Sequence, residues 1–265
     1  MMLIDNSEYM NILTSMYEFI RRAQYGAVAG VNYALMDKTE GKDQYVWYLQ
    51  KAVENGWSRN VLAMQIDSGL YQRQQGEKIQ NFEKLLPDTQ SELAIQTMKD
   101  PYIFDFVNMR EKMVETDIEH ELVSNVSKLL LELGRGFSFV GEQYEIKVGD
   151  NDFYIDLLFY NYILHCFVVV DLKTGKFVPE YAGKMNFYLS AVDDILKGDI
   201  DNPSIGLILC RDKNKVVAEY SLKDMSKPIG VSEYKLMDVL PDDIKENFPS
   251  TEEIETRILD KYKCD

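Results

Sequence analysis

One run of the sequence, Ile163 to Lys173, constrains the fold more than any other. Its centre, Cys-Phe-Val-Val-Val, is continuously apolar, which is typical of a central strand buried on both faces of a sheet. The turn residues Thr174-Gly175-Lys176 end this run. Two strand-like runs precede it, Tyr144 to Val148 and Phe153 to Tyr160, with the turn Gly149-Asp-Asn-Asp152 between them. The sequence therefore predicts three successive strands.

Helical patterns flank these strands. A helix capped by Thr116 or Asp117 is expected to end at Gly134, because its apolar residues recur with a period of 3.6 residues. Pro179 suits the first turn of another helix, which runs to about Lys197. The remaining expected elements are a buried strand, a short helix and an edge strand, at Ile205–Cys210, Val216–Leu222 and Val231–Leu236. The order α-β-β-β-α-β predicts an α/β domain on a mixed sheet.

The N-terminal region has helical patterns of its own. An amphipathic helix around Tyr45 to Val53 stops at Gly56, and Ser58 can cap the next helix, which ends near Gly69. A helix, a turn and a helix are equally typical of a helix-turn-helix motif and of two packed helices in a bundle. Both interpretations stay open.

Length and composition allow more than one domain. The 265 residues suffice for one large or two modest domains, and 46% hydrophobic with 28% charged residues is an ordinary globular composition. We expect a small helical N-terminal domain with a linker at about 85–105, then an α/β domain, then an acidic tail or helix. The expected limits are 1–105, 106–248 and 249–265.

Charge and cysteine content restrict the class of protein. The net charge of −15 disfavours nucleic acid at long range, although a local basic groove or a bound divalent metal can offset it. Cys166, Cys210 and Cys264 make no disulfide framework, and no apolar run reaches the roughly 18 residues of a membrane span. Neither a glycine-rich phosphate loop nor a zinc-ligand spacing occurs. We expect a cytoplasmic protein that does not contact a membrane.

Two aspartates stand where a buried strand should be apolar. Asp156 is the only charge in Phe153–Tyr160, and Asp171 and Lys173 end the continuous apolar run on one face of its strand. The midpoint between positions 156 and 171 falls between 163 and 164, inside the connection expected at Asn161 to His165. If the two runs form a hairpin, the carboxylates are cross-strand neighbours.

Such a pair needs a compensating charge. Like charges directly opposite on a sheet are destabilising, and an apolar environment adds to the cost. A salt bridge between Lys173 and one aspartate at the sheet rim is one explanation. The other is Mg²⁺, which binds oxygen ligands and keeps sites for water and phosphate. Two carboxylates with a nearby lysine are what phosphodiester hydrolysis requires.

Several phrases of the sequence resemble one protein family. Asp156…Asp171-Leu172-Lys173, on the second and third strands after a helix, is similar to the D…(D/E)xK signature of the restriction-endonuclease-like PD-(D/E)XK nucleases. The similarity is closest to the YhcG-type PDDEXK nuclease proteins and covers about residues 43 to 255. The phrases that carry it, in order, are Glu54–Asn60, Lys99–Phe106, Leu130–Phe137, Phe153–Tyr160, Asp171–Phe177, Pro179–Gly183, Asn186–Leu189 and Asn202-Pro203.

The resemblance implies a restriction-endonuclease-like αβββαβ fold and specific catalytic roles. Asp156 and Asp171 would bind Mg²⁺ or Mn²⁺, with the carbonyl of Leu172 as a third ligand. Lys173 would be the catalytic lysine. Glu119 matches the helical glutamate that often completes such sites, and a solvated helix face is its alternative.

The resemblance also implies substrate contacts, with departures. Gln143 and Tyr144 match the family, but Glu142 stands where the family usually has arginine. Related nucleases carry Gln-x-x-x-Tyr on the next helix, where this chain has Lys184 and Tyr188, four residues apart on one helix face. A lysine can hold a phosphate but cannot reproduce the paired contacts of an amide.

Other side chains have two interpretations each. Tyr162 and Tyr181 can stack on bases or be ordinary surface or core residues. Arg59, Arg73 and Lys78 can contact phosphate or simply be exposed. For each of these five residues, the sequence alone does not decide between the two roles.

The sequence as a whole indicates a Mg²⁺-dependent nuclease, with DNA favoured over RNA. The alternatives are a catalytically silent nucleic-acid-binding or protein-assembly module on a nuclease fold, and a defence effector that depends on a partner. A homo-oligomer or a partner protein is compatible with each of these functions.

Overall fold

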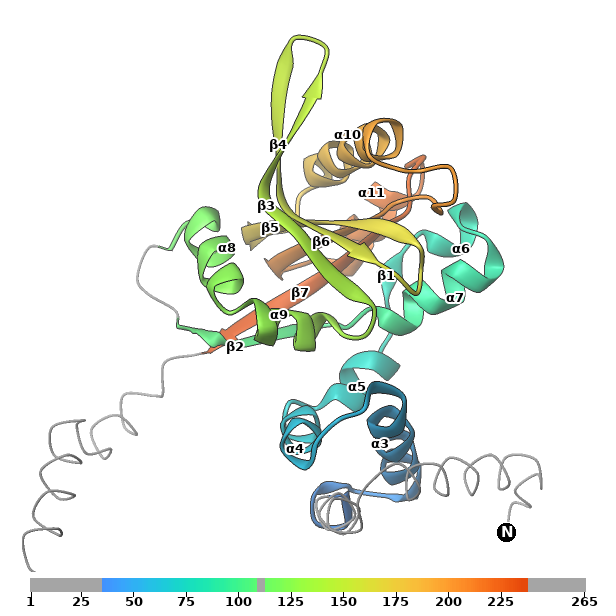
Figure 1. Cartoon of the computed structure of the whole chain (residues 1–265), viewed down its shortest axis with the longest axis vertical. Helices are drawn as coiled ribbons and strands as arrows, with labels where there is room; N and C mark the ends of the chain where they lie inside the picture. Colours follow the sequence, from blue (N-terminus) through green and yellow to red (C-terminus); the bar gives the residue numbers. More distant parts are fainter. Residues whose placement is uncertain (1–34, 109–112, 238–265) are drawn as a thin grey trace, which may run out of the picture.

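The computed structural model describes residues 35–108 and 113–237, and it contains a mixed sheet of seven strands with helices on both faces (Figure 1). The expected α/β class with a small helical N-terminal part is confirmed. The limits 1–105 and 106–248 stay predictions, and the acidic segment 249–265 lies outside the described residues. No helix within the described ranges is long and apolar enough to cross a membrane.

The N-terminal helical unit consists of α3 (Lys42–Asn55), α4 (Arg59–Asp67) and α5 (Leu70–Gln75). As predicted, α3 ends at Gly56, whose φ of 63° is the left-handed conformation that favours glycine. The Ser58 hydroxyl caps α4 by accepting a hydrogen bond from the Val61 amide. The unit has its own core, made of Leu35, Tyr48, Leu49, Ala52, Leu62, Ile66 and Leu70. A DNA-binding role for these helices stays a prediction.

The segment expected as a linker at 85–105 is folded onto the sheet, so that prediction is wrong. After β1 (Ile79–Gln80) and α6 (Phe82–Leu85), it contains α7 (Asp88–Thr97) and the start of β2 (Tyr102–Asn108). Its apolar residues are buried in the main core: Leu86, Ala94, Met98, Tyr102 and Phe104. Pro87, a residue type common in linkers, stands here at the start of α7, where a missing backbone N–H costs nothing.

The single helix expected from Thr116 or Asp117 is two helices, α8 (Glu115–Ser124) and α9 (Val126–Leu133). The expected caps lie inside the first turn of α8 instead of before it. Asn125, between the helices, has a φ of −114°, which is not helical. The apolar periodicity continues across this break, and for that reason the sequence pattern does not reveal it.

The three predicted strands are β3 (Phe137–Val148), β4 (Asn151–Asn161) and β5 (Cys166–Lys176). β3 begins well before Tyr144, the predicted start of this strand. The sequence pattern did not reveal the earlier residues, because the register with β4 shifts between Phe139 and Gly141 and this shift interrupts the alternation of side chains. α10 (Pro179–Ile195) and β6 (Ile205–Asp212) follow. The predicted order αβββαβ is confirmed.

The strand β7 (Ile229–Met237), which follows α11 (Lys215–Leu222), is not the edge strand that its sequence indicates. The sheet order is β1-β7-β6-β5-β4-β3, and β2 also pairs with β7. Val231 of β7 pairs with β1, and Tyr234 of β7 pairs with β2. Segments from far upstream therefore cover the backbone groups of β7, and no local pattern contains that information.

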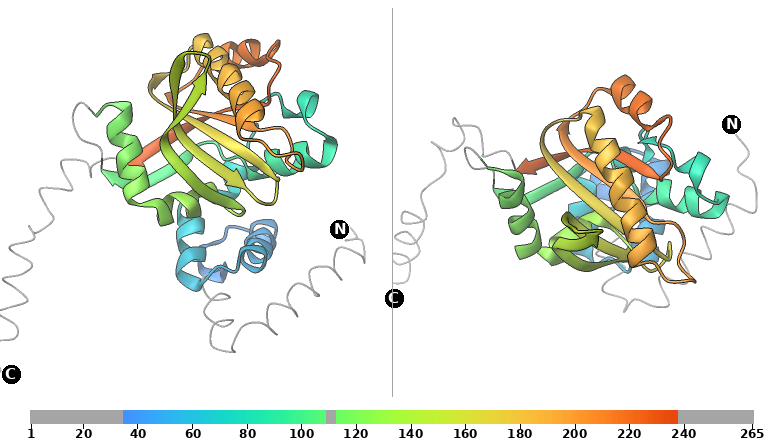
Figure 2. Two further views of the ribbon diagram at one scale, coloured as in Figure 1. Left: turned by 45° about the horizontal axis from the view of Figure 1, so that its top comes forward. Right: turned by 90° about the horizontal axis from the view of Figure 1, so that it is seen from above.

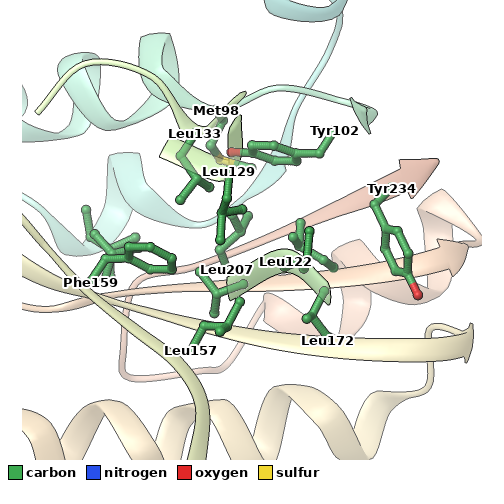
Figure 3. Close-up of a cluster of buried hydrophobic side chains, with 14 of the residues drawn as sticks. Met98, Tyr102, Leu122, Leu129, Leu133, Leu157, Phe159, Leu172, Leu207 and Tyr234 are labelled. Atoms are coloured by element: carbon green, nitrogen blue, oxygen red, sulfur yellow. The ribbon is translucent and has the colours of Figure 1, made fainter. Parts of the chain in front are cut away.

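Two helical layers cover the two faces of the sheet (Figure 2). The contacts of β5 with each layer show on which face the aspartates lie. α7, α8 and α9 pack on one face, where Leu172 of β5 belongs to the same apolar cluster as Leu122 and Leu157 (Figure 3). α10 and α11 pack on the other face, against Val169 of β5. Because side chains alternate along a strand, Asp171 and Lys173 lie on the α10 side.

Candidate active site

The hairpin predicted from the spacing of Asp156 and Asp171 is confirmed. Leu157 of β4 pairs with Val170 of β5, and the turn between the strands lies at residues 162–165. Continuing this antiparallel register by one residue places position 156 opposite position 171. The two carboxylates are therefore cross-strand neighbours.

Asp171 has a lysine at each carboxylate oxygen. The Lys184 ammonium, on α10, donates a hydrogen bond to Oδ1 at 3.0 Å. The Lys173 ammonium lies 2.9 Å from Oδ2 as an ion pair, yet this buried oxygen accepts no hydrogen bond from the residues that the structure describes. Asp171 is 2% exposed, so little water surrounds these charges. Its charge is compensated, but one buried oxygen keeps its capacity to bind a ligand.

Lys173 lies at the centre of the cluster. Its ammonium is 3.7 Å from Oδ2 of Asp156 and donates a hydrogen bond to the Leu172 carbonyl at 2.8 Å. Burial by itself lowers the pKa of Lys173, but the nearby carboxylates, Asp171 first, outweigh burial and raise this pKa. Lys173 is therefore a fixed positive charge at neutral pH.

The carboxyl group of Asp156 has a strongly raised pKa. Its Oδ2 accepts a hydrogen bond from the Leu172 amide at 2.9 Å. Burial, followed by repulsion from Asp171, raises the pKa of Asp156 to about 7, although Lys173 acts in the opposite direction. In the absence of a cation, the Asp156 carboxyl is therefore partly protonated near neutral pH.

The raised pKa of Asp156 predicts how pH affects the stability of the metal-free protein. The folded protein holds this proton up to about pH 7, whereas the unfolded chain releases it near the ordinary value of about 4. The proton on Asp156 therefore contributes to the free energy of unfolding. This contribution is complete below about pH 4 and is lost as the pH rises to about 7, by at most about 1.4 kcal/mol per pH unit. Urea unfolding should therefore show the parent losing stability relative to Asp156→Asn between about pH 4 and pH 7, with no further loss above that range. A difference that does not change with pH would contradict the raised pKa.

Glu115 is a site residue that the sequence analysis missed. Its Oε2 lies 3.2 Å from the Lys173 ammonium, and its Oε1 accepts a hydrogen bond from the Thr174 amide at 3.3 Å. Glu115 thereby ties the start of α8 to the end of β5. The available signal was its position four residues before Glu119, which places both on one face of a helix.

Glu119, in contrast, was anticipated, and it lies near the aspartates. It is buried, and its Oε2 accepts a hydrogen bond from the Gln143 side chain at 2.5 Å. Burial raises the pKa of Glu119, and the Gln143 contact opposes that rise. Gln143 has a φ of 43°, and the β3–β4 register places it opposite Asp156. This unusual backbone conformation brings the Gln143 amide to the site, although the site roles of both residues stay predictions.

Two tyrosines of α10 lie beneath the lysines. The Lys173 ammonium is 5.3 Å from the centre of the Tyr181 ring, and the Lys184 ammonium is 5.1 Å from that of Tyr188. The Tyr188 hydroxyl donates a hydrogen bond to the Tyr154 carbonyl at 2.7 Å. Both rings support the lysines, and the Tyr188 hydroxyl is already occupied by the backbone of β4.

Two of the three basic residues considered as phosphate contacts have a structural role instead. Arg73 is buried and forms an ion pair with Glu132 of α9 at 2.5 Å. Lys78 donates a hydrogen bond to the Arg73 carbonyl. Arg59 alone of the three is exposed. Arg73 joins the N-terminal helices to α9 and is not free for a ligand, and Lys78 is bound to the backbone of Arg73.

Solved structures with partial similarity include two endonuclease types. A repair endonuclease from Pyrococcus abyssi is 10% identical, with a TM-score of 0.32 over 49% of this chain and 50% of that chain. The structure of an EndoMS-dsDNA2 complex is 14% identical, with a TM-score of 0.33 over 50% of this chain and 49% of that chain. Neither similarity bears on the site or on the substrate.

Sequence comparison gives a stronger result. The family model described as the YhcG PDDEXK nuclease domain matches residues 95–249. The protein named "Putative nuclease YhcG" of Escherichia coli (strain K12) is 33% identical over 213 residues, which are 80% of this chain and 56% of that protein. The chain thus spans about half the length of this relative. On both grounds, the chain belongs to the YhcG PDDEXK nuclease domain family.

Proposed function

We propose that the protein is a divalent-metal-dependent nuclease that hydrolyses phosphodiester bonds, with DNA favoured over RNA. One observation carries the proposal: the buried carboxylates of Asp156 and Asp171 face each other across two strands, with the Lys173 ammonium between them. A carboxyl with a raised pKa, here that of Asp156, beside a second carboxylate and a lysine is typical of a catalytic site. A cytoplasmic location is compatible with the buried free thiols of Cys166 and Cys210.

The oxygen atoms present fit a small, hard cation. Within residues 35–108 and 113–237, no three His, Cys, Asp or Glu side chains are grouped to hold a metal. The donors here are two carboxylates, Asp156 and Asp171, and the Leu172 carbonyl; Oδ2 of Asp171 lies beside the Lys173 ammonium but accepts no hydrogen bond from the described residues. Mg²⁺ accepts so few protein ligands because it keeps several waters, and Mn²⁺ suits the same oxygens. When bound, the ion would polarise the phosphate and acidify a water.

The chain's own residues supply the rest of the chemistry. Lys173 keeps its proton, so its role is to orient water and to stabilise the negative charge that develops on the phosphate. Glu115 positions that ammonium from α8. Lys184 is half-exposed on α10 and can exchange its contact with Asp171 for a substrate phosphate.

The Lys184–Asp171 contact predicts competition with the cation. Replacing Lys184 by glutamine should lower the Mg²⁺ concentration for half-maximal cleavage about two- to tenfold, because the ammonium no longer occupies Oδ1 of Asp171. The effect is modest because the Lys184 side chain is 41% exposed. Lys223→Gln, at the end of α11, is the matched control and should change nothing. An unchanged or higher requirement in Lys184→Gln would contradict this role.

The decisive assay offers several substrates to one protein. Labelled duplex, single-stranded and branched DNA, and RNA, are incubated with the protein with and without Mg²⁺. We expect Mg²⁺-dependent products from at least one DNA substrate, and fewer from RNA. Absence of cleavage from every substrate, with Mg²⁺ and with Mn²⁺, would refute the proposal for the chain acting alone.

One observation favours a second candidate, a silent nucleic-acid-binding or assembly module. Both oxygens of Asp171 already contact an ammonium, so the site can be stable without a cation. A module of this kind, or an effector that requires a partner protein or a second copy, would not cleave when alone. Calorimetric titration with Mn²⁺ separates them, because a silent module has no reason to retain a cation site. Cleavage only after a partner is added would identify the effector.

A further inference from the structure

A cleft of about 360 Å³ lies between the N-terminal helical unit and the sheet domain. α3 and α5 line one side, and the α9–β3 loop and the β4–β5 turn line the other. Figure 1 shows this helical unit beneath the end of the sheet where α9 and β3 meet. None of the residues of the candidate active site lines the cleft. Its volume is in the range of small-ligand sites.

The charge of the cleft is opposite to that of the whole chain. Its lining contains three cations, Lys51, Lys99 and Arg135, and one acid, Glu54, whereas the chain as a whole has a net charge of −15. Lys51 is paired with Glu54 at 2.8 Å, and Lys99 is buried and paired with Glu132. Among the residues that the structure describes, none forms an ion pair with the exposed Arg135 guanidinium. The cleft therefore offers a free cation to an anionic ligand.

Apolar surface lies beside this cation. Tyr162 lines the cleft and is 53% exposed, and Leu131, which also lines it, is 39% exposed. Trp57 and Phe137 line the same cleft and are partly buried. An exposed aromatic ring in the same cleft as an unpaired guanidinium matches a flat aromatic base that carries a phosphate.

The backbone at Arg135 and Tyr162 is held in place. Gly136 has a φ of 93°, and a Cβ there would lie 2.5 Å from the Asn161 side chain, so only glycine fits. Asn161 accepts hydrogen bonds from the Ile163 and Leu164 amides, and the Tyr162 amide donates one to the Gly136 carbonyl at 3.0 Å. The loop and the turn are thus bound to each other. A preformed site of this kind loses little entropy when a ligand binds.

We infer that this cleft binds an unpaired nucleotide of a single-stranded nucleic-acid segment, with its base on Tyr162 and its phosphate on Arg135. The inference rests on the proposed function, because the strand would be the substrate. β4 carries Asp156 and ends at Asn161, so the cleft lies about 17 Å along this strand from the aspartates. That is at most about five nucleotides, the number for a strand stacked as in duplex DNA, and fewer for an extended single strand. The cleft would hold the substrate strand outside the site of cleavage.

Binding measured without divalent cation tests the inference separately from cleavage. Fluorescently labelled single-stranded DNA is titrated with the full chain in EDTA. Tyr162→Ala and Arg135→Ala should each raise the dissociation constant about tenfold, since stacking and phosphate contacts have effects of this size. The matched controls are Tyr220→Ala and Lys223→Ala at α11, which lines no part of the cleft. Tyr220 is 72% exposed, so both tyrosine variants leave the core intact.

Three results would overturn the inference. They are parent-like binding by Tyr162→Ala, equal losses in Tyr162→Ala and Tyr220→Ala, and binding of free dAMP as tightly as of the strand. The last would assign the cleft to a free nucleotide. If Tyr162 is required for binding but the chain cleaves nothing with Mg²⁺, the nuclease proposal is refuted and the inference that the cleft binds a nucleotide still stands. If the chain cleaves DNA and Tyr162 has no effect on binding, only the cleft fails.

Discussion

Asp171→Asn is expected to lower Mg²⁺-dependent cleavage about a thousandfold, because removing one charged group from a preorganised catalytic site has effects of this order. Asparagine keeps the size of the side chain but removes the charge that would hold the cation. It also leaves Lys173 paired with Asp156 and Glu115, so the buried ammonium keeps partners. The variant should therefore stay folded, and its defect should be chemical.

The control for this experiment is another aspartate–lysine pair of the same sheet. Asp212 on β6 lies 2.9 Å from Lys176, and both side chains are exposed. Asp212→Asn should cleave like the parent, and thermal unfolding of both variants should confirm that each is folded. Parent-like cleavage by folded Asp171→Asn would refute the assignment of this carboxylate to catalysis.

The largest loss of stability is expected from Glu132→Gln. Glu132 of α9 is buried, and its carboxylate forms ion pairs with Arg73 and Lys99. It also accepts a hydrogen bond from the Ile103 amide at 2.8 Å. Removing its charge leaves two buried cations without a carboxylate, which costs about 3–5 kcal/mol in the free energy of unfolding. Burial already lowers the pKa of Lys99 to about 8, so Lys99 can lose its proton in the variant. Because a neutral Lys99 needs no carboxylate, we expect a loss of stability in the lower half of this range.

An exposed ion pair provides the comparison. Lys38 and Asp67 are 2.6 Å apart, and their side chains are 35% and 59% exposed. Because water screens them, Asp67→Asn should cost at most about 1 kcal/mol. Urea unfolding of the two variants measures the contrast. Equal losses would show that the Arg73–Glu132–Lys99 cluster does not hold the N-terminal helices to the sheet domain.

The hairpin at the site could be predicted because its information is local. Side chains alternate with a period of two, and the positions of Asp156, Asp171 and the intervening turn determine a single register. The αβββαβ order followed in the same way from apolar runs and helix periodicity. In these elements, local pattern and tertiary structure agree.

The features that were missed depend on contacts between distant segments. Glu115 reaches Lys173 only because α8 packs beside the end of β5. β2 and β7 pair although more than a hundred residues separate them, and β2 therefore had no signal beyond a short apolar phrase. Arg73 looked like a surface arginine, because its partner Glu132 lies on another helix. Net charge, an average over the whole chain, likewise concealed the basic lining of the cleft.

The central claim is that one divalent cation is held jointly by side chains of β4 and β5. A crystal of the protein soaked in Mn²⁺ tests it through anomalous scattering, which locates the ion without reference to activity. The prediction is an anomalous peak in contact with Asp156 and Asp171, with the Lys173 ammonium displaced from Oδ2 of Asp171 but still at the site. An ordered site in which Lys173 and Lys184 keep their present contacts, and in which no peak appears at saturating Mn²⁺, would contradict it.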